Sequence, residues 1–140
     1  LLAAVVAGSI GEARRVASTP PEVADLHRYL RTLPADALVA GRSETLAAVP
    51  LLDRRRILED WEFALPYFRG YYHEVVRRTN ARESAWRTGS REALGRFCRD
   101  FGVTHLLVDR RAGQPPAFLP VLAAGPGFVN GRFLVAPCPA

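Results

Sequence analysis

Apolar residues in the first third of the chain recur at helical spacing and then gather into a short run. One helical face carries Val23, Leu26, Leu30 and Leu33. The TPPE segment at residues 19–22 precedes that face and has the form of a capping box, with Thr19 as the N-cap. Pro34 stops the helix, and the ALVA run at residues 37–40 predicts a short buried strand. This order is typical of the opening of an α/β layer.

A short helix and a second strand are predicted next. Ser43 is placed to cap a helix over residues 44–49, and Pro50 ends that helix. Residues 55–60 have an apolar centre between charged ends, which predicts a strand.

Two longer helices follow. From residue 67 the apolar positions return to helical spacing, which predicts a helix to about Asn80 with a continuation to Trp86. Residues 91–101 carry a second helical face, and Gly102 ends that helix.

The VTHLLV run at residues 103–108 is the strongest strand signal in the chain, and it ends at Asp109. A helix, a glycine and an apolar strand form the return half of a βαβ crossover, so this strand is predicted to be parallel and central. Residues 118–124 and 133–136 flank an Asn-Gly pair and predict a closing hairpin. The pattern therefore predicts an α/β fold: one domain over residues 16–140, with a small, mostly parallel, three-layer sheet, flanking helices and a C-terminal β-hairpin at the sheet edge.

The basic residues are all arginines, 19 of them against 14 acidic residues, which gives a net charge of +5. A GC-rich genome accounts for this composition, and recognition of phosphate or carboxylate is the functional alternative. The arginines are spread along the chain, which speaks against a nucleic-acid partner, because such a partner requires a concentrated basic face.

The first ten residues carry no charge and include no methionine. This run is too short to span a bilayer and lacks the basic region of a secretory signal. Two interpretations stay open on these residues alone: a buried element, or the last turns of a transmembrane helix, with Arg14 and Arg15 reaching toward headgroups. Cys98 and Cys138 form either a disulfide or two free thiols, and two cysteines decide little about the compartment.

Motifs for metal, nucleotide or nucleophile chemistry are incomplete. The HEVVR segment at residues 73–77 has arginine where a metalloprotease helix needs its second histidine. No G-x-S-x-G elbow and no phosphate-binding loop occur. We expect no metal site, no cofactor and no catalytic residue in this chain.

Four carboxylates remain as candidates for chemistry: Glu59, Asp60, Glu62 and Asp109. Asp109 ends a predicted parallel strand and Glu62 follows the other interior strand, so the two acids are candidates for an acid and base pair. The alternative, which we favour, is that these acids pair with the arginines at residues 54–56 and with Arg78.

A longer order of motifs resembles a known architecture. The segments are LPADALVA at 33–40, VPLLDRR at 49–55, EFALPY at 62–67, GYY at 70–72, Arg78, and FGVTHLLVD at 101–109. Together they resemble the C-terminal soluble tail of uncharacterised bacterial multi-pass membrane proteins, which are similar to GT-C class membrane glycosyltransferases that use polyprenyl-phosphate sugars.

The resemblance implies an accessory role at the cell membrane. Catalytic acids of such proteins lie in their membrane part, so this domain would pack on the membrane body of the same polypeptide, on the extracytoplasmic side, or help to bind a polyprenyl-phosphate-linked sugar. Residues 1–15 would be the end of a transmembrane helix or an exit linker, although basic flanks such as Arg14 and Arg15 favour the cytoplasm. The residues that match the recurring pattern form a predicted structural or ligand-facing cluster: Arg55, Glu62, Tyr71, Arg78 and Asp109.

Two other functions stay open. The first is a free-standing, arginine-rich module that binds a polyprenyl phosphate or an anionic glycan. The second is a small hydrolase that uses Glu62 and Asp109.

Overall fold

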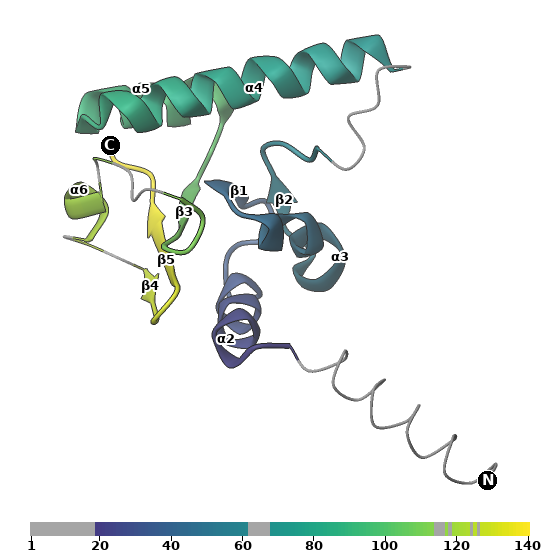
Figure 1. Ribbon diagram of the computed structural model, residues 1–140, viewed down its shortest axis with the longest axis vertical. Helices are drawn as coiled ribbons and strands as arrows, with labels where there is room; N and C mark the ends of the chain where they lie inside the picture. The colour runs from purple at the N-terminus through teal and green to yellow at the C-terminus, as the bar shows by residue number, and fades with distance from the viewer. Residues whose placement is uncertain (1–18, 62–67, 114–116, 118, 124, 126) are drawn as a thin grey trace, which may run out of the picture.

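The computed structural model describes residues 19–61, 68–113, 117, 119–123, 125 and 127–140, and these form a mixed α/β fold (Figure 1). None of the helices within these ranges is long and apolar enough to cross a bilayer. The predicted membrane-proximal segment, residues 1–15, lies outside the described residues.

The sheet has five strands in the order β2-β1-β3-β5-β4. Its strands are β1 (Leu38–Arg42), β2 (Arg56–Ile57), β3 (His105–Asp109), β4 (Phe128–Val129) and β5 (Phe133–Pro137). β1 pairs in parallel with both β2 and β3, whereas β5 pairs antiparallel with both β3 and β4. The sheet is therefore mixed, and the expected mostly parallel, three-layer arrangement is not confirmed. The predicted terminal hairpin is present, with β4 at the edge.

The helices belong to two groups that pack on opposite faces of the sheet (Figure 1). They are α2 (Pro21–Leu30), the 3-10 helix η1 (Glu44–Ala48), α3 (Val49–Asp53), α4 (Arg69–Thr88), α5 (Arg91–Phe101) and α6 (Leu119–Ala123). Alternate residues of β3 separate the two cores: Leu106 packs with α4, α5 and α6, and Leu107 packs with α2, η1 and α3.

Capping residues in the sequence correctly predicted two helix starts and one helix end. Ser43 and Ser90 accept hydrogen bonds from backbone amides at the starts of η1 and α5, and Gly102 ends α5 in the left-handed conformation. The predicted Thr19 cap is wrong, because α2 begins at Pro21 with Pro20 as its N-cap and no side-chain cap bond. Pro50 does not end the helix either. It lies in the first turn of α3, where proline is tolerated.

Apolar runs without such signals were harder to assign. The run at 118–124, predicted as a strand, contains the helix α6, and β4 takes its place in the hairpin. The strand predicted at 55–60 is limited to Arg56–Ile57, and α4 continues past Asn80 to Thr88, two residues beyond the predicted continuation to Trp86. Short apolar runs fit a strand or a helix equally until tertiary contacts select one.

The C-terminal tail is fixed to α5 by a disulfide between Cys98 and Cys138. It also packs closely there, since a Cβ on Gly95 would lie 3.1 Å from the Pro139 carbonyl oxygen. Between β1 and β3 the backbones approach so closely that a Cβ on Gly41 would lie 2.3 Å from the Leu107 carbonyl oxygen. Glycine at position 41 therefore allows the close contact on which the carboxyl edge of the sheet is built.

Candidate functional site

The carboxyl ends of β1 and β3 lie side by side, because Arg42 is in register with Val108. The β1–β2 connection packs on one face of the sheet, and the β2–β3 connection packs on the other. This change of direction makes the β1/β3 edge a topological switch point, which is where open α/β sheets bind ligands. We therefore take this edge as the candidate functional site.

Asp109 ends β3 at this edge and is almost completely buried. Arg132 donates from Nη2 to Oδ2 at 2.7 Å, and its Nε lies 3.1 Å from both carboxylate oxygens. The Ser43 hydroxyl donates to Oδ2 at 3.0 Å, and the Arg111 amide donates to Oδ1 at 2.9 Å. The carboxylate therefore ties together the ends of β1, β3 and the strand β5.

The pKa of Asp109 is held below its ordinary value of 3.8. Burial opposes ionisation, but the hydrogen bonds from Arg132, the Arg111 amide and Ser43 favour the carboxylate and outweigh it. Asp109 therefore stays ionised at neutral pH and acts as a fixed anion that holds loops together, not as a proton donor.

We expect this carboxylate to make the domain sensitive to acid. Because its folded pKa is lowered, Asp109 stabilises the fold above the unfolded pKa, and that contribution is lost as the pH falls from about 5 toward the lowered folded value. Asp109→Asn should lower the free energy of unfolding by about 1.5–3 kcal/mol at pH 7, and the deficit should shrink on acidification. Denaturant unfolding of the wild type and the variant at several pH values measures this stability deficit. A deficit that is constant with pH would contradict the lowered pKa of Asp109.

A second network lies where β1 and β2 meet α4. Arg82 is buried and donates from Nε to the Glu59 carboxylate at 2.5 Å and from Nη1 to Glu83 at 2.7 Å. Glu83 also accepts two hydrogen bonds from Arg42 at the end of β1. Burial opposes ionisation of Glu83, but Arg42 and Arg82 together lower its pKa. Four charges therefore lock the carboxyl edge of the sheet to the middle of α4.

A cavity of about 370 Å³ opens beside this network. Its lining includes Ser43 and Glu44 after β1, Glu59 and Trp61 after β2, and Arg82 of α4. Two polar groups in this wall have partners: Glu59 bonds Arg82 and Thr79, and the Trp61 indole N–H donates to the Thr79 hydroxyl at 3.1 Å. Arginine and carboxylate groups therefore form part of the wall of this cavity.

The five residues of the predicted cluster have different surroundings. Tyr71 and Arg78 act together, because their side chains donate to the carbonyls of Asp60 at 3.2 Å and Leu58 at 2.8 Å. These bonds place α4 against the chain that follows β2, the outer strand of the sheet. Arg78 also bonds Glu74 at 2.6 Å. Asp109 is paired with Arg132 at the carboxyl edge of the sheet, and Glu62 lies outside the described residues.

Arg55, the fifth member, caps the end of α2. Its guanidinium donates to the carbonyls of Leu33 at 2.6 Å and Arg31 at 2.8 Å, and to that of Asp53 at 3.0 Å. Carbonyls past the end of a helix lack intrahelical partners and carry partial negative charge, which a guanidinium satisfies. The expected pairing of the arginines at 54–56 with Glu59 and Asp109 is wrong, because Glu59 pairs with Arg82 and Asp109 pairs with Arg132.

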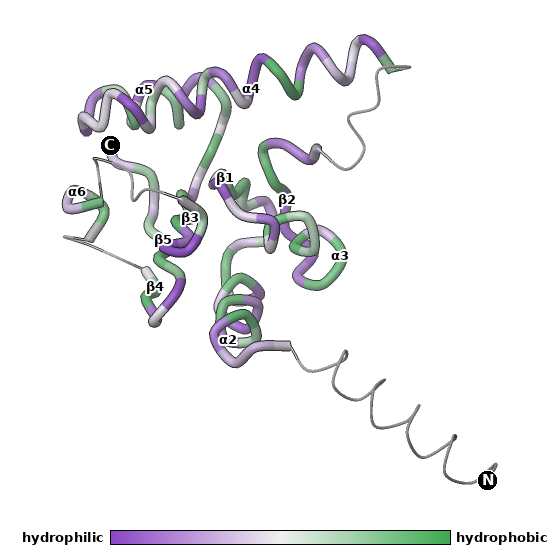
Figure 2. The backbone as a smooth tube through the Cα atoms, in the orientation of Figure 1, coloured by the Kyte–Doolittle hydropathy of each residue, from purple (hydrophilic) through white to green (hydrophobic). Residues whose placement is uncertain are grey.

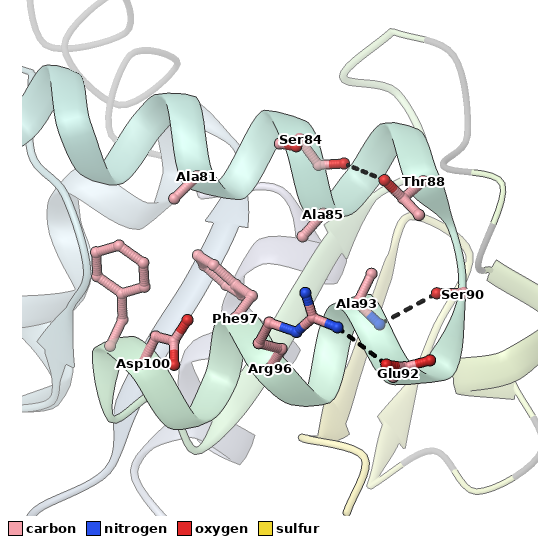
Figure 3. Close-up of a pocket in the computed structure, with 11 residues that line it drawn as sticks. Ala81, Ser84, Ala85, Thr88, Ser90, Glu92, Ala93, Arg96, Phe97 and Asp100 are labelled. Atoms are coloured by element: carbon pink, nitrogen blue, oxygen red, sulfur yellow. Dashed lines mark hydrogen bonds and ion pairs between the residues drawn. The ribbon is translucent and has the colours of Figure 1, made fainter.

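A groove of about 410 Å³ between α4 and α5 is a second hollow (Figure 3). Its polar groups serve the helices themselves: Arg96 pairs with Glu92, and Ser90 caps the Ala93 amide. The α4 wall of the groove consists of Ala81, Ser84, Ala85 and Thr88. This groove offers helix packing and no chemistry of its own.

The histidines do not form a metal site. His27 bonds the buried Asp53, His105 bonds the Thr104 hydroxyl at 2.9 Å, and His73 lies on α4. Within the described ranges no group of three or more histidine, cysteine or acidic residues is arranged to hold a metal ion. His105 therefore has a hydrogen-bond partner, as expected for a structural histidine.

Arg82 is the site residue that the sequence prediction missed. The signal was present, because the buried positions of α4 are Val75, Arg82, Ala85 and Trp86, which share one helical face. The predicted continuation of this helix to Trp86 included Arg82, but the arginine was not assigned to the buried face. A buried arginine requires a carboxylate partner.

Comparison with known proteins found no matching family model and no similar curated protein.

Proposed function

We propose that this chain is a non-catalytic accessory domain of a membrane glycosyltransferase-like protein, which packs on the membrane body of the same polypeptide or helps to bind its substrate. The observation that carries the proposal is the state of the acidic residues at the carboxyl edge. Asp109, Glu59 and Glu83 are each held by arginine. An acid–base catalyst needs a carboxyl group that exchanges its proton near the working pH, and the lowered pKa of Asp109 disfavours that role.

The disulfide supports an extracytoplasmic position for this domain at the cell membrane. Disulfides persist in oxidising compartments and are rare in the cytosol. Cys98 and Cys138 are joined, and the described residues include no free cysteine.

The two alternatives have less support. A free-standing module for a polyprenyl phosphate or an anionic glycan was expected to grip the anion with the arginines at 54–56, and two of these, Arg55 and Arg56, donate to backbone carbonyls instead. A hydrolase would need Asp109 to exchange protons while bonded to Arg132.

The proposal predicts that the intact gene encodes transmembrane helices upstream of this domain and exports the domain across the membrane. Alkaline phosphatase fused after Ala140 of the full-length protein should be active in a bacterial host, because that enzyme matures only outside the cytoplasm. A fusion to a short cytosolic protein is the negative control. An upstream sequence without transmembrane helices, or an inactive fusion that is expressed at normal levels, would overturn the proposal.

A further inference from the structure

Exposed large apolar side chains are concentrated in one part of the fold. Six occur among the described residues, and five of them come from the stretch 51–71: Leu51, Leu52, Trp61, Phe68 and Tyr71. The sixth, Val129, lies on β4 at the opposite edge of the sheet. Exposed large apolar side chains that are concentrated in one part of a fold can mark an interaction site.

The apolar residues of α3 and of the start of α4 belong to one region. Pro50 of α3 and Tyr71 of α4 line the same cavity of about 610 Å³. Figure 2 shows the apolar α3 and the start of α4 on the same side of the molecule. We call Leu51, Leu52, Phe68 and Tyr71 the apolar face.

The exposure of the two leucines follows from how α3 is anchored. Val49 and Asp53, four positions apart, share the buried side of this single turn. The Asp53 carboxylate bonds the His27 ring at 2.5 Å, which fixes α3 against α2. Leu51 and Leu52 are then directed to solvent, with exposed fractions of 83% and 51%.

Two arginines give this face its charge. Arg54 ends α3 in the left-handed conformation, with φ of 54°, and Arg69 begins α4. Both arginines are exposed. Asp53, the neighbour of Arg54 in the sequence, is buried and bonded to His27. The face therefore combines exposed apolar side chains with two exposed arginines.

We propose that the apolar face, with Arg54 and Arg69, docks on the surface of a bilayer that contains anionic lipids. Leucine and aromatic side chains enter the boundary between headgroups and acyl chains, and arginines beside them bind lipid phosphates. A second copy of the chain is a poorer occupant, because a symmetric contact would bring the same arginines together. The inference deepens the proposed function and rests on it for the nearness of a membrane.

The test is partition of the full 140-residue chain into vesicles of phosphatidylcholine with and without phosphatidylglycerol. The wild type should bind the anionic vesicles, and salt should weaken the binding. Leu51→Asp with Leu52→Asp should bind roughly tenfold more weakly. Val129→Asp is the matched control, since Val129 and Leu52 are both 51% exposed, and it should bind as the wild type does.

Tryptophan fluorescence locates the contact. Trp61 is about half exposed and adjoins the face in sequence, whereas Trp86 is buried. A blue shift on vesicle binding that disappears in Trp61→Phe assigns the contact to this region. Phe68→Asp gives a second test on the other element and should weaken binding in the same direction.

Equal binding by the wild type, the leucine variant and the Val129 variant would overturn the inference, because it would assign the binding to another segment such as the apolar run at 1–10. Absence of binding by the wild type would overturn it as well. Either result leaves the accessory role intact, because that role is tested separately by the upstream sequence and the phosphatase fusion.

Discussion

Replacement of Arg82 by methionine should destabilise the domain by about 3–5 kcal/mol. The guanidinium is buried against Glu59, whose side chain is only 7% exposed. Its removal leaves that carboxylate in a poorly solvated place with the Thr79 hydroxyl as its remaining hydrogen-bond donor. An unpaired buried charge costs far more than the net contribution of the pair. Denaturant unfolding at pH 7, followed by circular dichroism, measures the loss.

Two further variants test whether burial of the Arg82–Glu59 pair explains the loss of stability. Arg96→Met breaks an exposed pair with Glu92 on α5 and should cost less than about 1 kcal/mol. Adding Glu59→Gln to Arg82→Met removes the orphaned charge and should recover part of the lost stability. If Arg82→Met cost no more than Arg96→Met, the buried network would not be the lock between α4 and the sheet.

Reduction of the Cys98–Cys138 disulfide should lower the stability by about 2–5 kcal/mol. The bond closes a loop over a sequence separation of 40. It joins α5 to the end of β5, so it limits the unfolded chain across β3, α6, β4 and β5. Thermal unfolding with and without dithiothreitol should show a fall of roughly 10 °C in the midpoint.

The variant Cys98→Ala with Cys138→Ala is the control for the reductant. Its midpoint should already be low, and dithiothreitol should not change it further. A wild-type midpoint that is insensitive to the reductant, with both thiols shown to be free by labelling, would mean that the bridge contributes little to the fold.

Much of the secondary structure could be predicted because its signals are local. The helix at 91–101 was placed with both ends correct, since Ser90 and Gly102 act on backbone groups a few residues away. The strand at 103–108 was found from its unbroken apolar run, and β3 forms there at His105–Asp109. The Asn-Gly pair marked the hairpin, although its first strand is Phe128–Val129 and not the earlier apolar run.

The candidate site was less predictable. Tyr71 and Arg78 were selected together, and both bind the chain that follows β2. Asp109 was expected at the carboxyl end of a parallel strand, and it lies there. The pairing of Asp109 with Arg132 was not predicted, because Arg132 reaches Asp109 only when β5 runs antiparallel beside β3. Arg82 was missed although it shares a helical face with Val75 and Trp86. Its pairing with Glu59 depends on how α4 packs on the sheet.

The sequence by itself determined where most helices and strands lie, because caps, prolines, glycines and apolar periods act over three or four residues. The tertiary structure alone decided which of the 19 arginines meets which acid or carbonyl. Arg82 meets Glu59 across 23 positions, and Arg55 meets the Leu33 carbonyl across 22. A guanidinium binds any carboxylate or carbonyl within reach, and only the packing of the chain brings one of them into reach.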